Sequence, residues 1–164
     1  MTRRARCAGA LLTALALMGC GPAVSITNTV GEQVAARGQT DDGAPLDLVS
    51  ASRPVVLFFT MRGSGRCMGM YPRVAALRAA YPVARARFVL VDVFDTRPME
   101  RPAALGPDVD LLTDPGTWAR HFDVRQVPRV IIVGSGGTVL FDEALYSDPA
   151  YFDRVAAVLS VVTR

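Results

Sequence analysis

The stretch Val55-Val56-Leu57-Phe58-Phe59-Thr60-Met61-Arg62-Gly63-Ser64-Gly65-Arg66-Cys67 decides the fold of this chain. Its first five residues form an unbroken apolar run, which is typical of a strand buried on both faces. From Cys67 to residue 81, apolar residues recur at helical spacing, so a helix is predicted there. A C-x-x-C at such a strand-to-helix turn is a redox motif. Ser64 occupies the first position here, so no disulfide can close within the motif.

The rest of the chain continues the alternation of strands and helices. Residues 87–94 are predicted as a second buried strand, and a short helix is expected over 114–122, with Asp114 as its cap. The remaining predicted segments are a strand at 129–133, a glycine-rich turn at 134–137, a returning strand at 138–141, and a helix starting at Asp148 or Pro149. Residues 25–30 are a candidate first strand, and 38–45 and 95–110 are predicted as irregular. A right-handed crossover then gives an α/β fold, a mixed sheet with helices on both faces.

Two segments of the chain resemble the thioredoxin-like superfamily. Residues 59–72 are similar to its active-site segment, with Ser64 and Cys67 on the two cysteine positions and Pro72 on the helix proline. Residues 122–133 are similar to the segment that carries its cis-proline, here Pro128. The details resemble membrane-anchored thioredoxin-like proteins related to the alkyl hydroperoxide reductase group. The resemblance implies a thioredoxin-like fold and a cis Val127–Pro128 bond.

The N-terminal residues are predicted as a targeting signal rather than part of the domain. Arg3, Arg4 and Arg6 precede a short apolar run, which is typical of a secretory signal peptide. The run ends in Leu17-Met18-Gly19-Cys20, which resembles a bacterial lipobox; an ordinary cleaved signal with a chance cysteine is the alternative. We expect a lipoprotein signal peptide at 1–19, Cys20 as the site of lipid attachment (palmitate included), a tether at 20–24 and one domain at 25–164.

This processing sets the charge and the expected location. All 18 basic residues are arginine, and three of them lie in the signal, so 15 arginines face 15 acidic residues in the mature chain. That balance gives no reason to expect nucleic-acid binding. We expect a protein of the bacterial cell envelope, anchored by lipid and facing the periplasm or the exterior. Cys67 would be its single free thiol in an oxidising compartment.

Cys67 is the candidate catalytic residue. In the family it resembles, the first cysteine attacks and the second, more buried cysteine resolves, so this chain retains only the second. Ser64 can cap the helix. Arg66, the nearby Arg62, and Arg129 next to the expected cis-Pro128 would favour the thiolate if they face Cys67. Two alternatives stay open: the arginines are ordinary solvated side chains, and Cys67 is a small buried apolar residue.

Three functions follow as hypotheses from these residues. The first is a monothiol redox protein that forms mixed disulfides with an envelope protein or a low-molecular-weight thiol. The second is a peroxidase, because Ser64-x-x-Cys67 is similar to the T-x-x-C of peroxiredoxins. Thr60 replaces the proline of that family, and its arginine would have to be supplied by Arg129. The third is a non-catalytic peptide-binding module. His121 has no ligand at metal-binding spacing, so neither a metal nor a cofactor is expected.

Overall fold

The computed structural model describes residues 30–144, 148 and 150–164. The predicted signal peptide (1–19), Cys20, the tether and nearly all of the candidate strand at 25–30 therefore lie outside the described residues. Within the described part of the chain, no helix is long and apolar enough to cross a membrane.

A five-stranded sheet forms the centre of the domain, in the order β5-β4-β3-β6-β7. The inner strand β3 (Val55–Thr60) is buried along its whole length, as its unbroken apolar sequence predicts. β3, β4 (Arg87–Val93) and β5 (Asp110–Asp114) run parallel, whereas β6 (Arg129–Val133) and β7 (Val139–Ala144) are antiparallel to their neighbours. The sheet is thus mixed, and the fold is α/β, as predicted.

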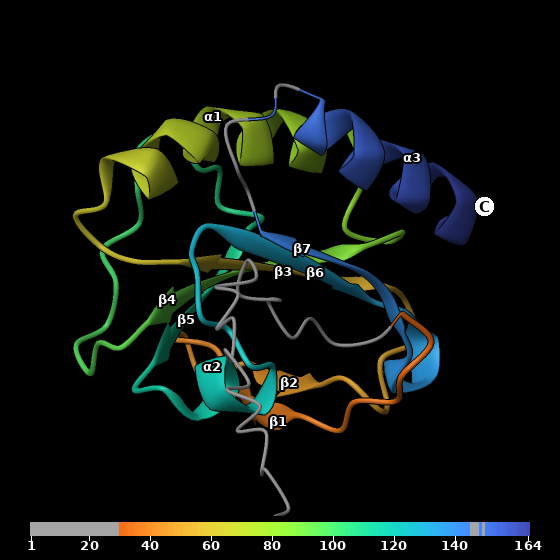
Figure 1. The fold of residues 1–164 in the computed structure, drawn as a ribbon, viewed down its shortest axis with the longest axis horizontal. Helices are drawn as coiled ribbons and strands as arrows, with labels where there is room; N and C mark the ends of the chain where they lie inside the picture. Colours follow the sequence, from red (N-terminus) through yellow and green to blue (C-terminus); the bar gives the residue numbers. More distant parts are fainter. Residues whose placement is uncertain (1–29, 145–147, 149) are drawn as a thin grey trace, which may run out of the picture.

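Helices cover both faces of this sheet (Figure 1). α1 (Gly65–Ala80) and α3 (Tyr151–Val162) lie on one face, and α2 (Thr117–His121) lies on the other with a hairpin of β1 (Arg37–Gln39) and β2 (Pro45–Asp47). Because side chains alternate along a strand, β3 feeds two separate cores. Val56 and Phe58 pack toward α1 and α3, and Leu57 and Phe59 pack toward α2.

Three predicted segments differ in the structure. Residues 110–114, which span the end of the predicted irregular region at 95–110 and the start of the helix predicted over 114–122, form β5, an edge strand paired with β4. The predicted turn-rich loop at 38–45 is the connection of the β1–β2 hairpin. The Asp114 carboxylate does cap α2, since it accepts the Trp118 amide at 2.9 Å and the Ala119 amide at 2.8 Å, but the helix itself begins only at Thr117.

One edge of the sheet carries the candidate site. The carboxyl ends of β3 and β4 meet there, and the antiparallel β6 begins at the same edge, where Arg129 lies opposite Phe59. The Val127–Pro128 peptide bond is cis, as the resemblance implied. Extending the β3–β6 register by one residue puts Pro128 opposite Thr60, directly before the motif loop.

Candidate functional site

Ser64 and Cys67 form the first turn of α1. Ser64 has extended backbone angles, as an N-cap requires, and its Oγ lies 3.5 Å from the Cys67 amide nitrogen that donates to it. A turn closed by the Ser64 amide on the Met61 carbonyl, at 3.2 Å, joins β3 to the helix. Gly63 lies in this turn with a φ of 77°, where a residue with a side chain would be strained.

Cys67 lies on the buried face of α1. Its side chain has no solvent-exposed surface. The same face of the helix continues with the buried residues Met70, Tyr71 and Val74. Ser64, three residues earlier, is on the same helical face and only half-buried, so it lies between Cys67 and solvent. In this conformation the thiol is closed to solvent, and the half-buried Ser64 is its neighbour on the same side of the first helical turn.

A polar cluster lies beneath the helix start, within an otherwise apolar core. The hydroxyls of Thr60, at the end of β3, and Tyr71, on α1, lie 3.3 Å apart. Asp92 of β4 is opposite Thr60 in the sheet and is fully buried. Burial raises the pKa of Tyr71 above its usual value; the Thr60 hydrogen bond opposes this shift, and the nearby Cys67 and Asp92 add to it. The charge states of Cys67 and Asp92 therefore influence the ionisation of the Tyr71 hydroxyl.

Arg62 connects this cluster to the motif loop. Its amide donates to Asp92 Oδ1 at 2.9 Å, and its guanidinium donates to Asp92 Oδ2 at 3.1 and 2.8 Å. The same guanidinium donates to the Arg97 carbonyl at 3.0 Å and lies 3.5 Å from Asp95. Arg62, the second residue of the turn before Ser64, is thus fixed to β4 and to the loop after it.

Arg129 does not supply the free positive charge that the sequence predicted for it. Its side chain is 1% exposed and donates to both carboxylate oxygens of Asp142, at 2.6 and 2.7 Å, and to the Asp123 carbonyl at 2.9 Å. It also shares its sheet face with Ile131 and Val133, which pack toward α2 and not toward α1. A buried guanidinium needs a carboxylate partner, and Asp142 provides it.

Arg66 and Pro128 complete the set of predicted site residues. Arg66 is exposed in the first turn of α1 and forms no ion pair within the described residues. Pro128 is buried at the start of β6. The structure thus brings Ser64, Cys67 and Pro128 to one edge, leaves Arg66 at its surface and places Arg129 in the opposite core.

Sequence reasoning missed Thr60, Tyr71 and Asp92 as part of the site. Asp92 carried a usable signal, since it is the one carboxylate inside the apolar run of residues 88–94. A charge in a strand that is buried on both faces requires a buried partner. The identity of that partner, Arg62, depends on the loop conformation and was not readable from spacing. Among residues 30–144, 148 and 150–164, no group of three or more His, Cys, Asp or Glu side chains is placed to hold a metal ion.

Comparison with known proteins supports the fold. No family model matches the chain, and no curated protein matches it in sequence. Solved structures do match. A thioredoxin-like protein from Aeropyrum pernix is 17% identical with a TM-score of 0.62, over 78% of this chain and 89% of the other. A Chlorobium tepidum protein assigned as the thiol:disulfide interchange protein DsbE is 17% identical with a TM-score of 0.67, over 83% and 99%.

A third structure, a secreted Mycobacterium tuberculosis disulfide oxidoreductase homologous to E. coli DsbE, is 17% identical with a TM-score of 0.58, over 77% of this chain and 96% of the other. These structures have the same strand-and-helix arrangement over most of their length. The chain therefore has a thioredoxin-like fold.

Proposed function

From this thioredoxin-like fold, we propose that the protein is a thiol–disulfide redox protein of the bacterial cell envelope that acts through the single thiol of Cys67. The observation that carries the proposal is the position of Cys67, in the first turn of a 16-residue helix and beside a cis-proline edge. A helix N-terminus stabilises a thiolate through its free amides and its dipole. The matching structures described as disulfide oxidoreductase and interchange proteins support the same chemistry.

The reaction is a single thiol–disulfide exchange. The Cys67 thiolate attacks one sulfur of a partner disulfide, forms a mixed disulfide with it and releases the other sulfur as a thiolate. A thiol of the partner, or a low-molecular-weight thiol, then attacks the mixed disulfide and regenerates Cys67. Ser64 takes no part in the exchange because a hydroxyl forms no disulfide. A second thiol must therefore come from outside the chain in every cycle.

We further propose that residues 1–19 are removed as a signal peptide and that lipid on Cys20 anchors the domain to the membrane. The basic, apolar and Gly19-Cys20 segments of the sequence support this. An anchored domain meets its partners within the envelope, where disulfides form and persist.

A non-catalytic peptide-binding module is the second candidate function, favoured by the complete burial of Cys67. The peroxidase hypothesis has less support, because Arg129, the arginine it requires, is bonded to Asp142.

The test is mixed-disulfide formation on the folded full chain. The chain is incubated with a short peptide that carries one disulfide. After acid quenching and proteolytic digestion, mass spectrometry measures the mass of the fragment that contains Cys67. We expect an adduct at Cys67 and none in Cys67→Ala, with Ser64→Ala as a matched control that leaves the thiol in place. An adduct that forms only in denaturant would reject the redox function and leave the binding module.

A further inference from the structure

The edge that carries the motif also exposes two large apolar side chains. Met61 directly follows β3 and is 44% exposed, and Phe94 directly follows β4 and is 65% exposed. Because Thr60 and Asp92 are opposite each other in parallel strands, Met61 lies beside Val93, next to Phe94. The two side chains therefore emerge from neighbouring strand ends.

Phe94 has a backbone conformation that a bulky side chain rarely adopts. Its φ is 62°, in the left-handed region where the Cβ crowds the following carbonyl oxygen. The ring is not buried in return, so packing of the free domain does not explain the conformation. A strained residue that presents an exposed aromatic ring points to a use for that ring outside the domain.

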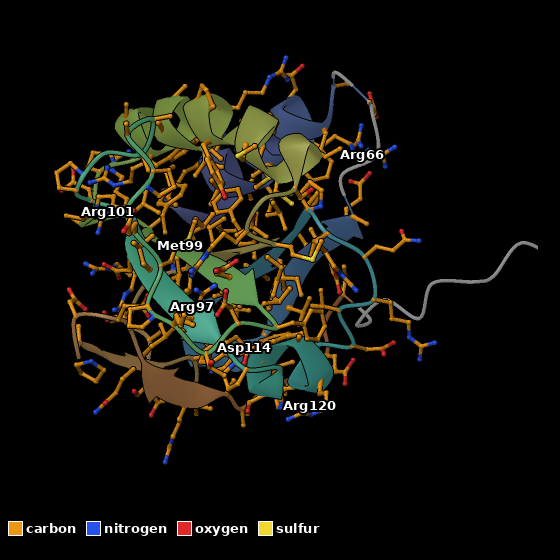
Figure 2. All side chains as sticks on the ribbon, turned by 90° about the vertical axis from the view of Figure 1, so that its left-hand side faces the viewer. Arg66, Arg97, Met99, Arg101, Asp114 and Arg120 are labelled. Carbon is orange, nitrogen blue, oxygen red and sulfur yellow. The ribbon has the colours of Figure 1, made fainter. Side chains whose placement is uncertain are left out.

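Exposed arginines lie on the segments that end at the motif edge. Figure 2 labels three of them, Arg66 on α1, Arg97 in the loop after β4 and Arg120 on α2. Arg120 lies close to Phe94, since a Cβ built on Gly116 would be 3.0 Å from Arg120 Nη1 and 3.5 Å from Phe94 Cδ1. Neither Arg66 nor Arg120 forms an ion pair within the part of the chain that the structure describes, and Arg97 shares Asp95 with Arg62.

We propose that these five residues, Met61, Arg66, Phe94, Arg97 and Arg120, form an edge surface that docks an acidic segment of a partner protein, extended and carrying apolar side chains. Arg66 and Arg120, which form no ion pair among the described residues, select for carboxylates, and the exposed Met61 and Phe94 contact apolar side chains. We take the occupant to be a polypeptide because the surface lies at the motif edge, where the proposed function brings in protein disulfides. The proposal rests on the proposed function in one respect: it names the partner class that would be presented to Cys67.

The experiment measures binding of two labelled ten-residue peptides to the full chain by fluorescence anisotropy. One peptide alternates glutamate with leucine, and the other alternates lysine with leucine. We expect the glutamate peptide to bind at least tenfold more tightly, and its affinity to fall as salt is raised from 50 to 500 mM, because exposed charge pairs are screened. Equal binding of the two peptides, or binding insensitive to salt, would overturn the proposal.

Variants then locate the binding surface. Arg66→Gln and Arg120→Gln should each weaken binding of the glutamate peptide by about threefold to fivefold, the range of exposed ion pairs. Phe94→Gly should weaken it further while the domain remains folded, because glycine adopts a positive φ without strain. Arg85→Gln is the matched control, since Arg85 is exposed at the opposite end of β4. Unchanged binding in all three edge variants would reject the surface.

Two further measurements separate this proposal from others. Cys67→Ala should bind the glutamate peptide as the wild type does. The docking proposal can therefore be rejected while Cys67 is found reactive, and the redox proposal can be rejected while peptide binding is found. Vesicles of phosphatidylglycerol and phosphatidylcholine serve as the membrane comparison. If the edge variants weaken vesicle binding but not peptide binding, the surface is a membrane contact and the peptide proposal is wrong.

Discussion

At position 64, a hydroxyl lies where a second thiol would complete a dithiol motif. Ser64 Oγ is already directed at the Cys67 amide, 3.5 Å away, so the side chain at this position points along the face that contains Cys67. Serine keeps the capping role of the position, worth about 0.5–2 kcal/mol in general, without any chemistry toward disulfides.

Ser64→Cys should therefore create a dithiol site. Residues three apart in the first helical turn share one face, so the two sulfurs are within reach of each other, and the outer one lies at the helix N-terminus, where the thiolate is favoured. We expect turnover in an insulin-reduction assay with dithiothreitol, with none for wild type or Ser64→Ala. A variant that forms the internal disulfide on oxidation yet shows no turnover would contradict this.

The Arg62–Asp92 pair should respond asymmetrically to substitution. Asp92 is fully buried, whereas the Arg62 side chain is 35% exposed and also contacts Asp95. Arg62→Met leaves a buried carboxylate without its cation and should lower the free energy of unfolding by about 3 kcal/mol. Asp92→Asn leaves an arginine that can turn to solvent, so about 1–2 kcal/mol is expected.

Urea denaturation at neutral pH measures both values. Arg37→Met, which breaks the exposed Arg37–Asp47 pair, is the control and should cost less than about 1 kcal/mol. If Asp92→Asn were more destabilising than Arg62→Met, the unpaired buried charge of Asp92 would not be the main cost of breaking the pair.

At the scale of elements, the turn between β6 and β7 is tightly constrained at one of its two glycines. Gly136 and Gly137 both have positive φ, 79° and 87°, but only Gly137 is enclosed. A Cβ on Gly137 would lie 2.5 Å from the Val34 carbonyl oxygen, whereas nothing lies within 4 Å of one on Gly136. Val34 also donates to the Gly137 carbonyl at 2.8 Å, so this turn is fixed to the N-terminal segment.

Alanine at these two positions should separate conformational strain from steric exclusion. Gly136→Ala meets only the positive φ and should cost about 1–2 kcal/mol. Gly137→Ala must also displace backbone, so it should cost clearly more, read from the shift in urea midpoint. Equal costs would mean that the Val34 segment moves freely.

The sequence predicted most of these elements, and its failures have physical reasons. The inner strands and α1 were found because long apolar runs and helical spacing report burial directly. β5 was missed because an edge strand is short, and prolines before it indicated irregular structure. Of the candidate site residues, Ser64 and Cys67 lie at the start of α1, where the sequence predicted a helix. The direction of the Arg129 side chain was not predictable, because it depends on the strand alternation and on Asp142 of β7.

At the scale of the whole molecule, the central sheet separates two buried polar groups, one in the core on each of its faces. Arg129–Asp142 lies toward α2, and the polar cluster of Thr60, Tyr71 and Asp92 lies beneath α1. The motif edge contains the first turn of α1, with Ser64 and Cys67, and also the exposed Phe94 and arginines. A partner that docks there would therefore lie next to the helix turn that contains Cys67.

The proposed location in the cell envelope rests on sequence outside the described part of the chain, so it has a test of its own. Cys20→Ser should abolish lipid attachment, so the protein should shift from the membrane fraction to uncleaved or soluble protein in a bacterial host that processes lipoproteins. Cys7→Ser is the control, because Cys7 leaves with the predicted signal. A soluble wild-type protein that begins at a residue other than Cys20 would contradict the anchor.

The most direct measurement of the central claim is the rate at which iodoacetamide alkylates Cys67 in the folded full chain, followed as a function of low urea concentration. If Cys67 acts as a thiol in exchange, a local opening at the Ser64 end must expose it, so alkylation should be fast and nearly independent of urea below the unfolding transition. If Cys67 is a structural residue of the core, alkylation should occur only through global unfolding and accelerate with urea as steeply as the unfolding equilibrium does. That second result would contradict the account.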